Sequence, residues 1–274
     1  MQTFEQRLRY RGWHSAIVLC WLMVLPVVGQ AASWRQVSSQ HFQVFYRDHA
    51  AFASAVLTSA EQYYDQIRLD FGLHHVVQRN HVPWLWDDRC RIYLYADQQT
   101  YLEETGAPAW SGGFVQYRHR VIYSYSHTAT FLSRTLPHEI AHILFREFVG
   151  FDNPQVPPWL DEGVAQYAES DKRAGELVRM HQWVSRGLYI PFEQFSQLPG
   201  HNASAVQVFY TQASTLVHFF IETYGRHRFI EWCSHLRDGR SLERALSFAT
   251  DGRISDLTAL EEDWLTFLFS LPSP

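Results

Sequence analysis

Two histidines four residues apart, His138 and His142, constrain the fold of this chain more than any other feature of its sequence. The α-helix places residues i and i+4 on one face, one turn apart, so the spacing predicts a helix through this stretch. On such a helix both imidazoles can bind one tetrahedral Zn²⁺ ion. Glu139 follows His138 directly and is rotated away from it around the helix. Its carboxylate can reach a water molecule at the open position of the metal and act as general base.

The third protein ligand decides which kind of metal site is expected. In the three-histidine variant of this motif, positions 145 and 148 would hold glycine and histidine, but here they hold Phe145 and Phe148. The other common arrangement takes a glutamate from a following helix about twenty residues on, and Glu162 is 20 positions after His142 (162 − 142). Asp161, one residue closer, is a competing ligand. A packed structural helix with two surface histidines is the alternative to a metal site.

The residues around Glu162 resemble a known family. The segment Trp159–Tyr167 (WLDEGVAQY) is similar to the W-L-x-E-G-x-A segment of the gluzincins, which are HExxH-plus-glutamate zinc metallopeptidases. The segments Thr135–His142, Trp110–Phe114 and Phe209–Ser214 resemble the small "peptidase MA-like" branch of that clan. The likeness spans about residues 34–230. It implies a thermolysin-like core and a hydrolase that acts on a peptide or protein substrate.

The resemblance also implies roles for individual residues. His138, His142 and Glu162 correspond to the zinc ligands and Glu139 to the general base, and the W-L-x-E-G register favours Glu162 over Asp161 as the third ligand. This chain has no G-x-M-E-N segment, which favours an endopeptidase over removal of amino-terminal residues.

Related enzymes use a tyrosine or histidine from their helical part to stabilise the oxyanion. Tyr210 is the candidate here, and His201 and His218 are weaker alternatives; Tyr210 could also be a packed helix residue. Gln166 or Glu169 could orient a ligand imidazole from behind.

The sequence predicts an α+β fold in two parts. Over residues 32–128 the pattern predicts a mixed α/β part with a small sheet, with strands at 41–46, 91–95 and 120–125 and helices at 50–71 and 98–104. Residues 129–274 are predicted to be helical, with helices at 131–148, 158–170, 173–186, 204–224, 226–236, 241–248 and 257–268. We expect the zinc cleft at the junction of the two parts. The glycine pair Gly112–Gly113 indicates either a tight turn or a strand edge that binds substrate.

Residues 1–31 differ from the rest of the chain. Arg7, Arg9 and Arg11 precede an apolar run at 16–28, and small residues follow at 29 and 31, which is typical of a signal peptide. We therefore expect export to the periplasm or the extracellular space, with membrane contact only if this segment stays uncleaved. Two cysteines would remain, Cys90 and Cys233, which could pair or be two buried thiols.

Composition narrows the function further. A hydrophobic content of 46% and an aromatic content of 16% allow a substantial core, and the net charge of −5 with scattered Lys and Arg excludes a nucleic-acid partner. The sequence does not indicate an oligomeric state. Two alternatives to an active secreted peptidase stay open: an inactive peptidase-like binding module, and a membrane-tethered envelope assembly factor.

Overall fold

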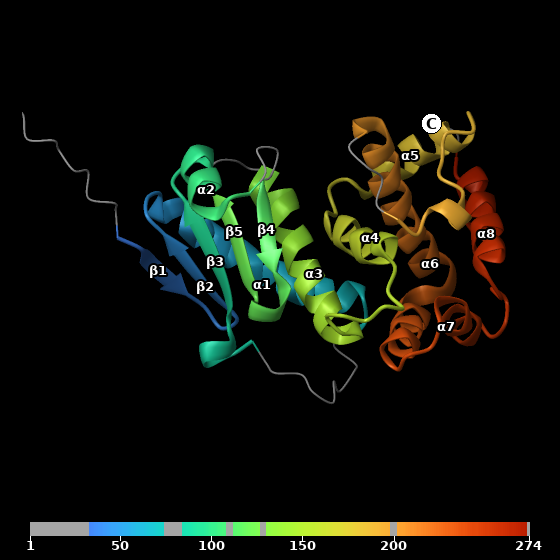
Figure 1. The fold of residues 1–274 in the computed structure, drawn as a ribbon, viewed down its shortest axis with the longest axis horizontal. Helices are drawn as coiled ribbons and strands as arrows, with labels where there is room; N and C mark the ends of the chain where they lie inside the picture. Colours follow the sequence, from blue (N-terminus) through green and yellow to red (C-terminus); the bar gives the residue numbers. More distant parts are fainter. Residues whose placement is uncertain (1–32, 74–83, 108–111, 127–129, 198–201, 273–274) are drawn as a thin grey trace, which may run out of the picture. The chain divides into compact units, whose positions relative to one another are not determined.

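A five-stranded mixed sheet forms the N-terminal part of the protein, with strand order β1-β2-β3-β5-β4 (Figure 1). The structure is a computed structural model that describes residues 33–73, 84–107, 112–126, 130–197 and 202–272. The strands are β1 (Arg35–Ser38), β2 (Phe42–Tyr46), β3 (Cys90–Tyr95), β4 (Gly113–Gln116) and β5 (Val121–Tyr125). β2, β3 and β5 run parallel, and β1 and β4 add antiparallel edges.

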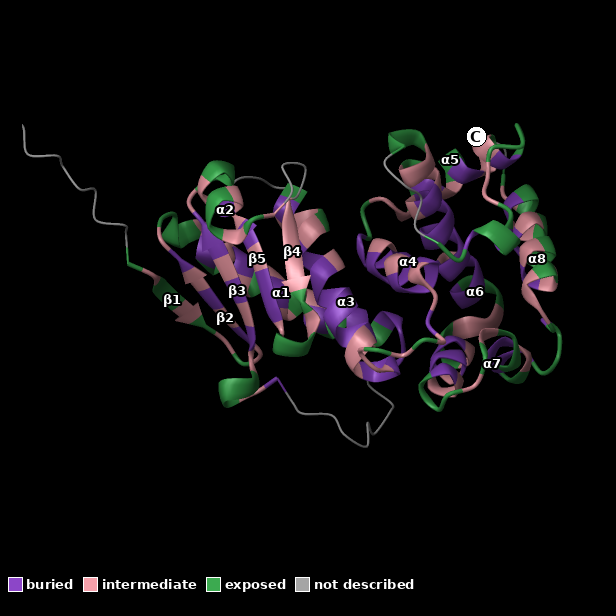
Figure 2. Cartoon of the chain, in the orientation of Figure 1, coloured by how far each residue is buried: buried purple, intermediate pink, exposed green. Residues whose placement is uncertain are grey.

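The strands show the alternation that their sequences predict. In β2, Phe42, Val44 and Tyr46 are buried while Gln43 and Phe45 are half-buried. Figure 2 shows buried and half-buried segments along the central strands of the sheet. Parallel neighbours need a crossover connection, and helix α1 (Ala50–Asp70) lies between β2 and β3 in the chain and packs against β2. A shorter helix, α2 (Gln98–Thr105), ends at Gly106, whose φ of 69° is the left-handed conformation common after helices.

The C-terminal part is helical. Its helices are α3 (Leu136–Val149), α4 (Pro158–Ala168), α5 (Arg173–Val184), α6 (Ala203–Arg237), α7 (Leu242–Ala249) and α8 (Leu257–Ser270). Single turns complete the described part: η2 (Trp86–Asp88), η3 (Tyr117–His119), η4 (Phe131–Thr135) and η5 (Phe192–Gln194). The helices predicted at 204–224 and 226–236 are the two halves of α6, which is kinked at Gly225, where φ is 84° and ψ is 159°.

The α+β fold class is confirmed. Two short strands, β1 and β4, were not predicted. Ser33–Pro274 forms one compact unit, and the division into parts at residues 128 and 129 stays a prediction. The predicted signal peptide lies outside the described residues. Cys90 and Cys233 are buried free thiols, not a disulfide.

No helix in the described part of the chain has the length and apolar character needed to cross a membrane.

Candidate metal centre

Helix α3 is buried on nearly all sides because it packs against α1, α4 and α6. It begins at Leu136, after the π-helical turn η4, and Pro137 therefore lies in its first turn, where the missing N–H is tolerated. This start places His138, Glu139 and His142 in the first two turns of a rigid helix. The imidazoles of His138 and His142 leave the same face, with ring centroids 4.7 Å apart.

Three atoms from α3 and α4 converge on one point. The Nε2 atoms of His138 and His142 lie 3.1 Å apart, and Glu162 Oε2 lies 3.7 Å from the first and 3.5 Å from the second. A tetrahedral zinc ion with bonds of about 2.0–2.1 Å needs donor atoms about 3.3–3.4 Å apart. The observed triangle matches that spacing, so these three side chains could hold a metal ion.

The far side of each imidazole contacts a carboxylate. His138 Nδ1 lies 3.0 Å from Glu169 Oε1, and His142 Nδ1 lies 3.1 Å from Asp161 Oδ1. A proton on Nδ1 that is donated to a carboxylate leaves the Nε2 lone pair free, which is the tautomer that a metal ligand requires. The donor chemistry therefore fits a zinc ion as well as the spacing does.

Asp161, the competing candidate for the third metal ligand, lies behind the His142 ring. It is not part of the converging group; its second oxygen, Oδ2, accepts a hydrogen bond from Arg146 at 2.8 Å. Burial alone would raise the pKa of Asp161, but His142 and Arg146 outweigh it and hold the pKa below its ordinary value. Asp161 therefore stays ionised behind the His142 ring.

The electrostatics of the centre favour a cation. Burial would lower the pKa of His142, but Asp161 and Glu162 raise it well above the ordinary histidine value. Burial raises the pKa of Glu139, opposed by the two histidines and reinforced by Glu162. A buried carboxylate with a raised pKa is suited to accept a proton near neutral pH.

A cavity of about 380 Å³ opens beside these residues. Its lining includes His138 and Glu139 from α3, Gln166 and Glu169 from the end of α4, and the glycine pair Gly112–Gly113. Gln166 accepts a hydrogen bond from Lys172 at 3.4 Å, whereas Glu169 contacts the His138 ring, so of the two orienting candidates Glu169 is the one that contacts a proposed ligand.

Two tyrosines lie within electrostatic range of the centre. Burial, reinforced by Glu162, raises the pKa of Tyr210 to about 12, so its hydroxyl keeps its proton and can donate. Tyr117, on η3, makes an edge contact with the His142 ring at 5.6 Å, and burial raises its pKa too. Tyr117 was not predicted as a site residue, because no motif surrounds it in the sequence.

Of the other histidine candidates, His218 is described and does not join this group. His218, on α6, contacts the rings of Tyr167 and Phe267 instead. His201 and the histidines at 74, 75 and 81 lie outside the described residues. The roles of His138, His142, Glu162, Glu139 and Tyr210 stay predictions. The geometry fits the three proposed ligands, and Glu139 lines the adjoining cavity.

Comparison with known proteins identifies the family of this chain. No curated protein matches the chain. A family model of the Peptidase MA superfamily matches residues 86–270, which is more than half of the chain and includes every residue of the candidate centre. The chain therefore belongs to the Peptidase MA superfamily, a family of metallopeptidase-like proteins.

Proposed function

We propose that the protein is a zinc-dependent endopeptidase of the gluzincin type. The observation that carries this proposal is the triangle of two Nε2 atoms and one carboxylate oxygen, with sides of 3.1, 3.5 and 3.7 Å, formed by His138, His142 and Glu162. Carboxylates behind both rings and a buried Glu139 beside them support it.

The proposed reaction is hydrolysis of a peptide bond. When bound, Zn²⁺ would polarise the substrate carbonyl and lower the pKa of a water molecule. Glu139 takes a proton from the attacking water and passes it to the nitrogen of the leaving amine, so that water adds across the cleaved C–N bond. Tyr210 donates a hydrogen bond to the carbonyl oxygen as negative charge develops there.

The edge strand β4 is suited to bind a substrate in an extended conformation. β4 is an edge strand that packs near α3, and an extended peptide can add to such an edge through main-chain hydrogen bonds. At Gly113 a Cβ atom would lie 3.0 Å from Tyr123 O and 3.2 Å from Thr135 Cγ2. Glycine therefore lets β4 lie close to the start of α3, which favours the substrate-edge interpretation of the glycine pair over a simple turn.

Replacing Glu139 with glutamine tests the mechanism. The variant keeps the size of the side chain and both histidines, so it should bind one zinc ion per chain, measured by elemental analysis, and hydrolyse a peptide library at least 100-fold more slowly. Glu243→Gln, at an exposed position on α7, is the matched control and should retain activity. If Glu139→Gln cleaves as fast as the unmodified protein, the mechanism is wrong.

The same experiment separates the proposal from an inactive binding module. A module would hold zinc in the unmodified protein but cleave no peptide. Export remains part of the proposal and depends on residues 1–31 alone; N-terminal sequencing of the mature protein tests it and distinguishes a secreted enzyme from a tethered one.

A further inference from the structure

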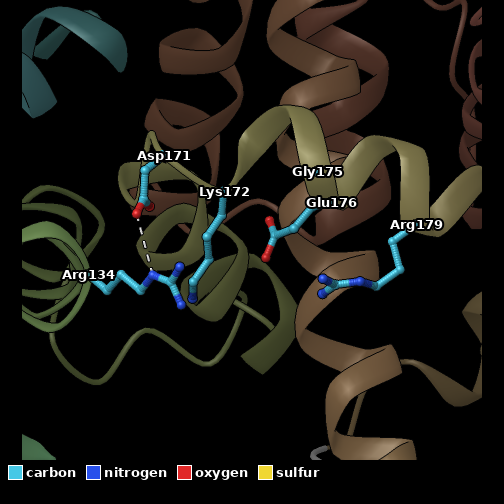
Figure 3. A pocket seen from close by; sticks show the side chains of 6 residues that line it. All are labelled: Arg134, Asp171, Lys172, Gly175, Glu176 and Arg179. Atoms are coloured by element: carbon cyan, nitrogen blue, oxygen red, sulfur yellow. Dashed lines mark hydrogen bonds and ion pairs between the residues drawn. The ribbon is translucent and has the colours of Figure 1, made fainter. Parts of the chain in front are cut away.

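A second cavity, of about 250 Å³, adjoins the cavity of the candidate centre. It lies around the start of α5, and six residues line it: Arg134, Asp171, Lys172, Gly175, Glu176 and Arg179 (Figure 3). Arg134 and Lys172 also line the 380 Å³ cavity that contains His138 and Glu139. The two cavities therefore share a wall, which is formed by the basic side chains of Arg134 and Lys172.

The charges in the second cavity are not balanced. Asp171 pairs with Arg134 at 3.4 Å, but both side chains are more than 40% exposed, so the pair is loose and screened by water. Arg179 has no ion pair among the described residues; it lies 6.0 Å from the Trp183 ring, and in Figure 3 its guanidinium points toward Glu176.

Glu176, one of the two acids that line this cavity, is largely withdrawn from solvent. It is only 5% exposed, and its carboxylate accepts a hydrogen bond from the Ser214 hydroxyl at 2.5 Å. Burial raises the pKa of Glu176, opposed by Ser214 and by the nearby Lys172 and Arg179. The lining therefore holds three cations, Arg134, Lys172 and Arg179, and two carboxylates.

Lys172 links this cavity to the metal centre. Its ammonium forms an ion pair with Glu169, which contacts His138 Nδ1 from behind. A peptide whose carbonyl lies at the centre would have a neighbouring side chain or its own terminus within reach of the shared wall. Guanidinium groups bind carboxylates through paired, charge-assisted hydrogen bonds.

We propose that the cavity bounded by Arg134, Lys172 and Arg179 is a carboxylate-binding subsite that selects substrates with an acidic side chain or a free C-terminal carboxylate beside the cleaved bond. The inference rests on the proposed peptidase function and adds a substrate class to it. Arg134 and Arg179 are the residues to test, because replacing Lys172 would also disturb Glu169 and His138.

The first experiment measures cleavage of proteome-derived peptides by mass spectrometry. The peptides are divided into three libraries: the first keeps its acidic groups, the second has only its C-termini amidated, and the third has side-chain and terminal carboxyls amidated. We expect cleavage to favour the first library by about tenfold over the third, a factor typical of one charge-assisted hydrogen bond at a partly exposed site. The second library then shows whether the carboxylate comes from a side chain or from the terminus.

Arg134→Gln and Arg179→Gln should each remove most of this preference, and Arg179→Glu should reverse it. Arg244→Gln, at an exposed position on α7, is the matched control and should leave it unchanged. If the unmodified protein cleaves with no acidic preference, or if the variants keep the preference, the subsite is refuted and the peptidase function stands.

A binding measurement keeps the test valid without turnover. Alanine pentapeptides with a central Glu or Gln, each with a free or an amidated C-terminus, are titrated against the zinc-loaded Glu139→Gln protein. Tighter binding of the carboxylate peptides, lost in Arg179→Gln, supports the subsite even if no peptide is cleaved, in which case only the proposed function fails. Equal binding of all four peptides overturns the subsite.

Discussion

Gly163, the residue after the proposed ligand Glu162, lies where α4 crosses α6 at very short range. A Cβ atom at this position would be 2.6 Å from the carbonyl oxygen of Ala213 and 2.9 Å from Val217 Cγ2. Gly163 has no side chain to separate the helices, so α4 can carry Glu162 close to α3. Gly163→Ala therefore tests whether this close contact sets the position of the ligand.

The size of the effect follows from these distances. Ordinary contacts begin near 3.4 Å, so α4 must move away from the Ala213 carbonyl by about 0.8 Å (3.4 − 2.6). Overpacking of this kind costs up to ~3 kcal/mol, and the better helix propensity of alanine offsets ~1 kcal/mol. We expect a net loss of ~2 kcal/mol, which lowers the melting temperature of a domain this size by about 4–8 °C.

The movement should also weaken metal binding. Zinc–ligand distances tolerate only about ±0.2 Å, so a shift of the backbone beside Glu162 should reduce zinc affinity at least tenfold. Calorimetry of the metal-free protein measures the first effect, and competition with a chromogenic chelator measures the second.

Gly175→Ala is the control, because a Cβ atom at this position of α5 has nothing within 4 Å. It should leave zinc affinity unchanged and stabilise the fold slightly. If Gly163→Ala melts with the unmodified protein and binds zinc equally well, then the close α4–α6 contact does not position Glu162, which refutes the prediction.

Three further predictions concern the surroundings of the centre and the stability of the sheet. Asp161→Ala should weaken zinc binding about 10–100-fold by leaving His142 Nδ1 without its acceptor, whereas Asp161→Asn should lose less because its amide oxygen can still accept; chelator competition measures both. Tyr210→Phe should lower kcat about 100-fold with little change in KM if Tyr210 donates to the oxyanion. Tyr117→Phe should have the smaller effect. If the order of the two effects is reversed, Tyr117 is the donor. Burial would raise the pKa of Glu61, but hydrogen bonds from the His41 main chain and from Ser39 lower it. Ionised Glu61 therefore stabilises the fold at pH values above its unfolded pKa, and this contribution is lost as the pH falls through its folded pKa. Urea unfolding of Glu61→Gln should therefore show a weaker loss of stability below about pH 5, and an unchanged acid slope would contradict this.

The parts of the fold that the sequence could predict are those with a clear period. β2, β3, β5 and the long helices have enough residues for alternation or helical spacing to be visible. β1 and β4 have four residues each, are partly exposed, and lie at the sheet edges, where pairing with a neighbour defines the strand and the apolar pattern does not. Such strands depend on contacts made only in the folded chain.

The residues of the candidate site likewise include some that the sequence could predict and some that it could not. The spacing of His138, His142 and Glu162 is local information, and the helices place these residues together. Arg146 also had a signal, because it continues the same helix face four residues after His142, but its partner could not be read from spacing alone. Tyr117 had none, since its position beside His142 depends on how η3 packs against α3.

Asp161 and Glu162, the two acids between which the W-L-x-E-G register favoured Glu162, have different places around His142. Adjacent residues on a helix point about 100° apart, so Asp161 and Glu162 cannot both approach a metal from the same direction. An imidazole, however, has two nitrogens on opposite sides of its ring. α4 places Glu162 on the Nε2 side of His142 and Asp161 on the Nδ1 side, so the two acids hold one ring between them. Both acids therefore contact the same histidine, Glu162 on the side of the proposed metal position and Asp161 behind the ring.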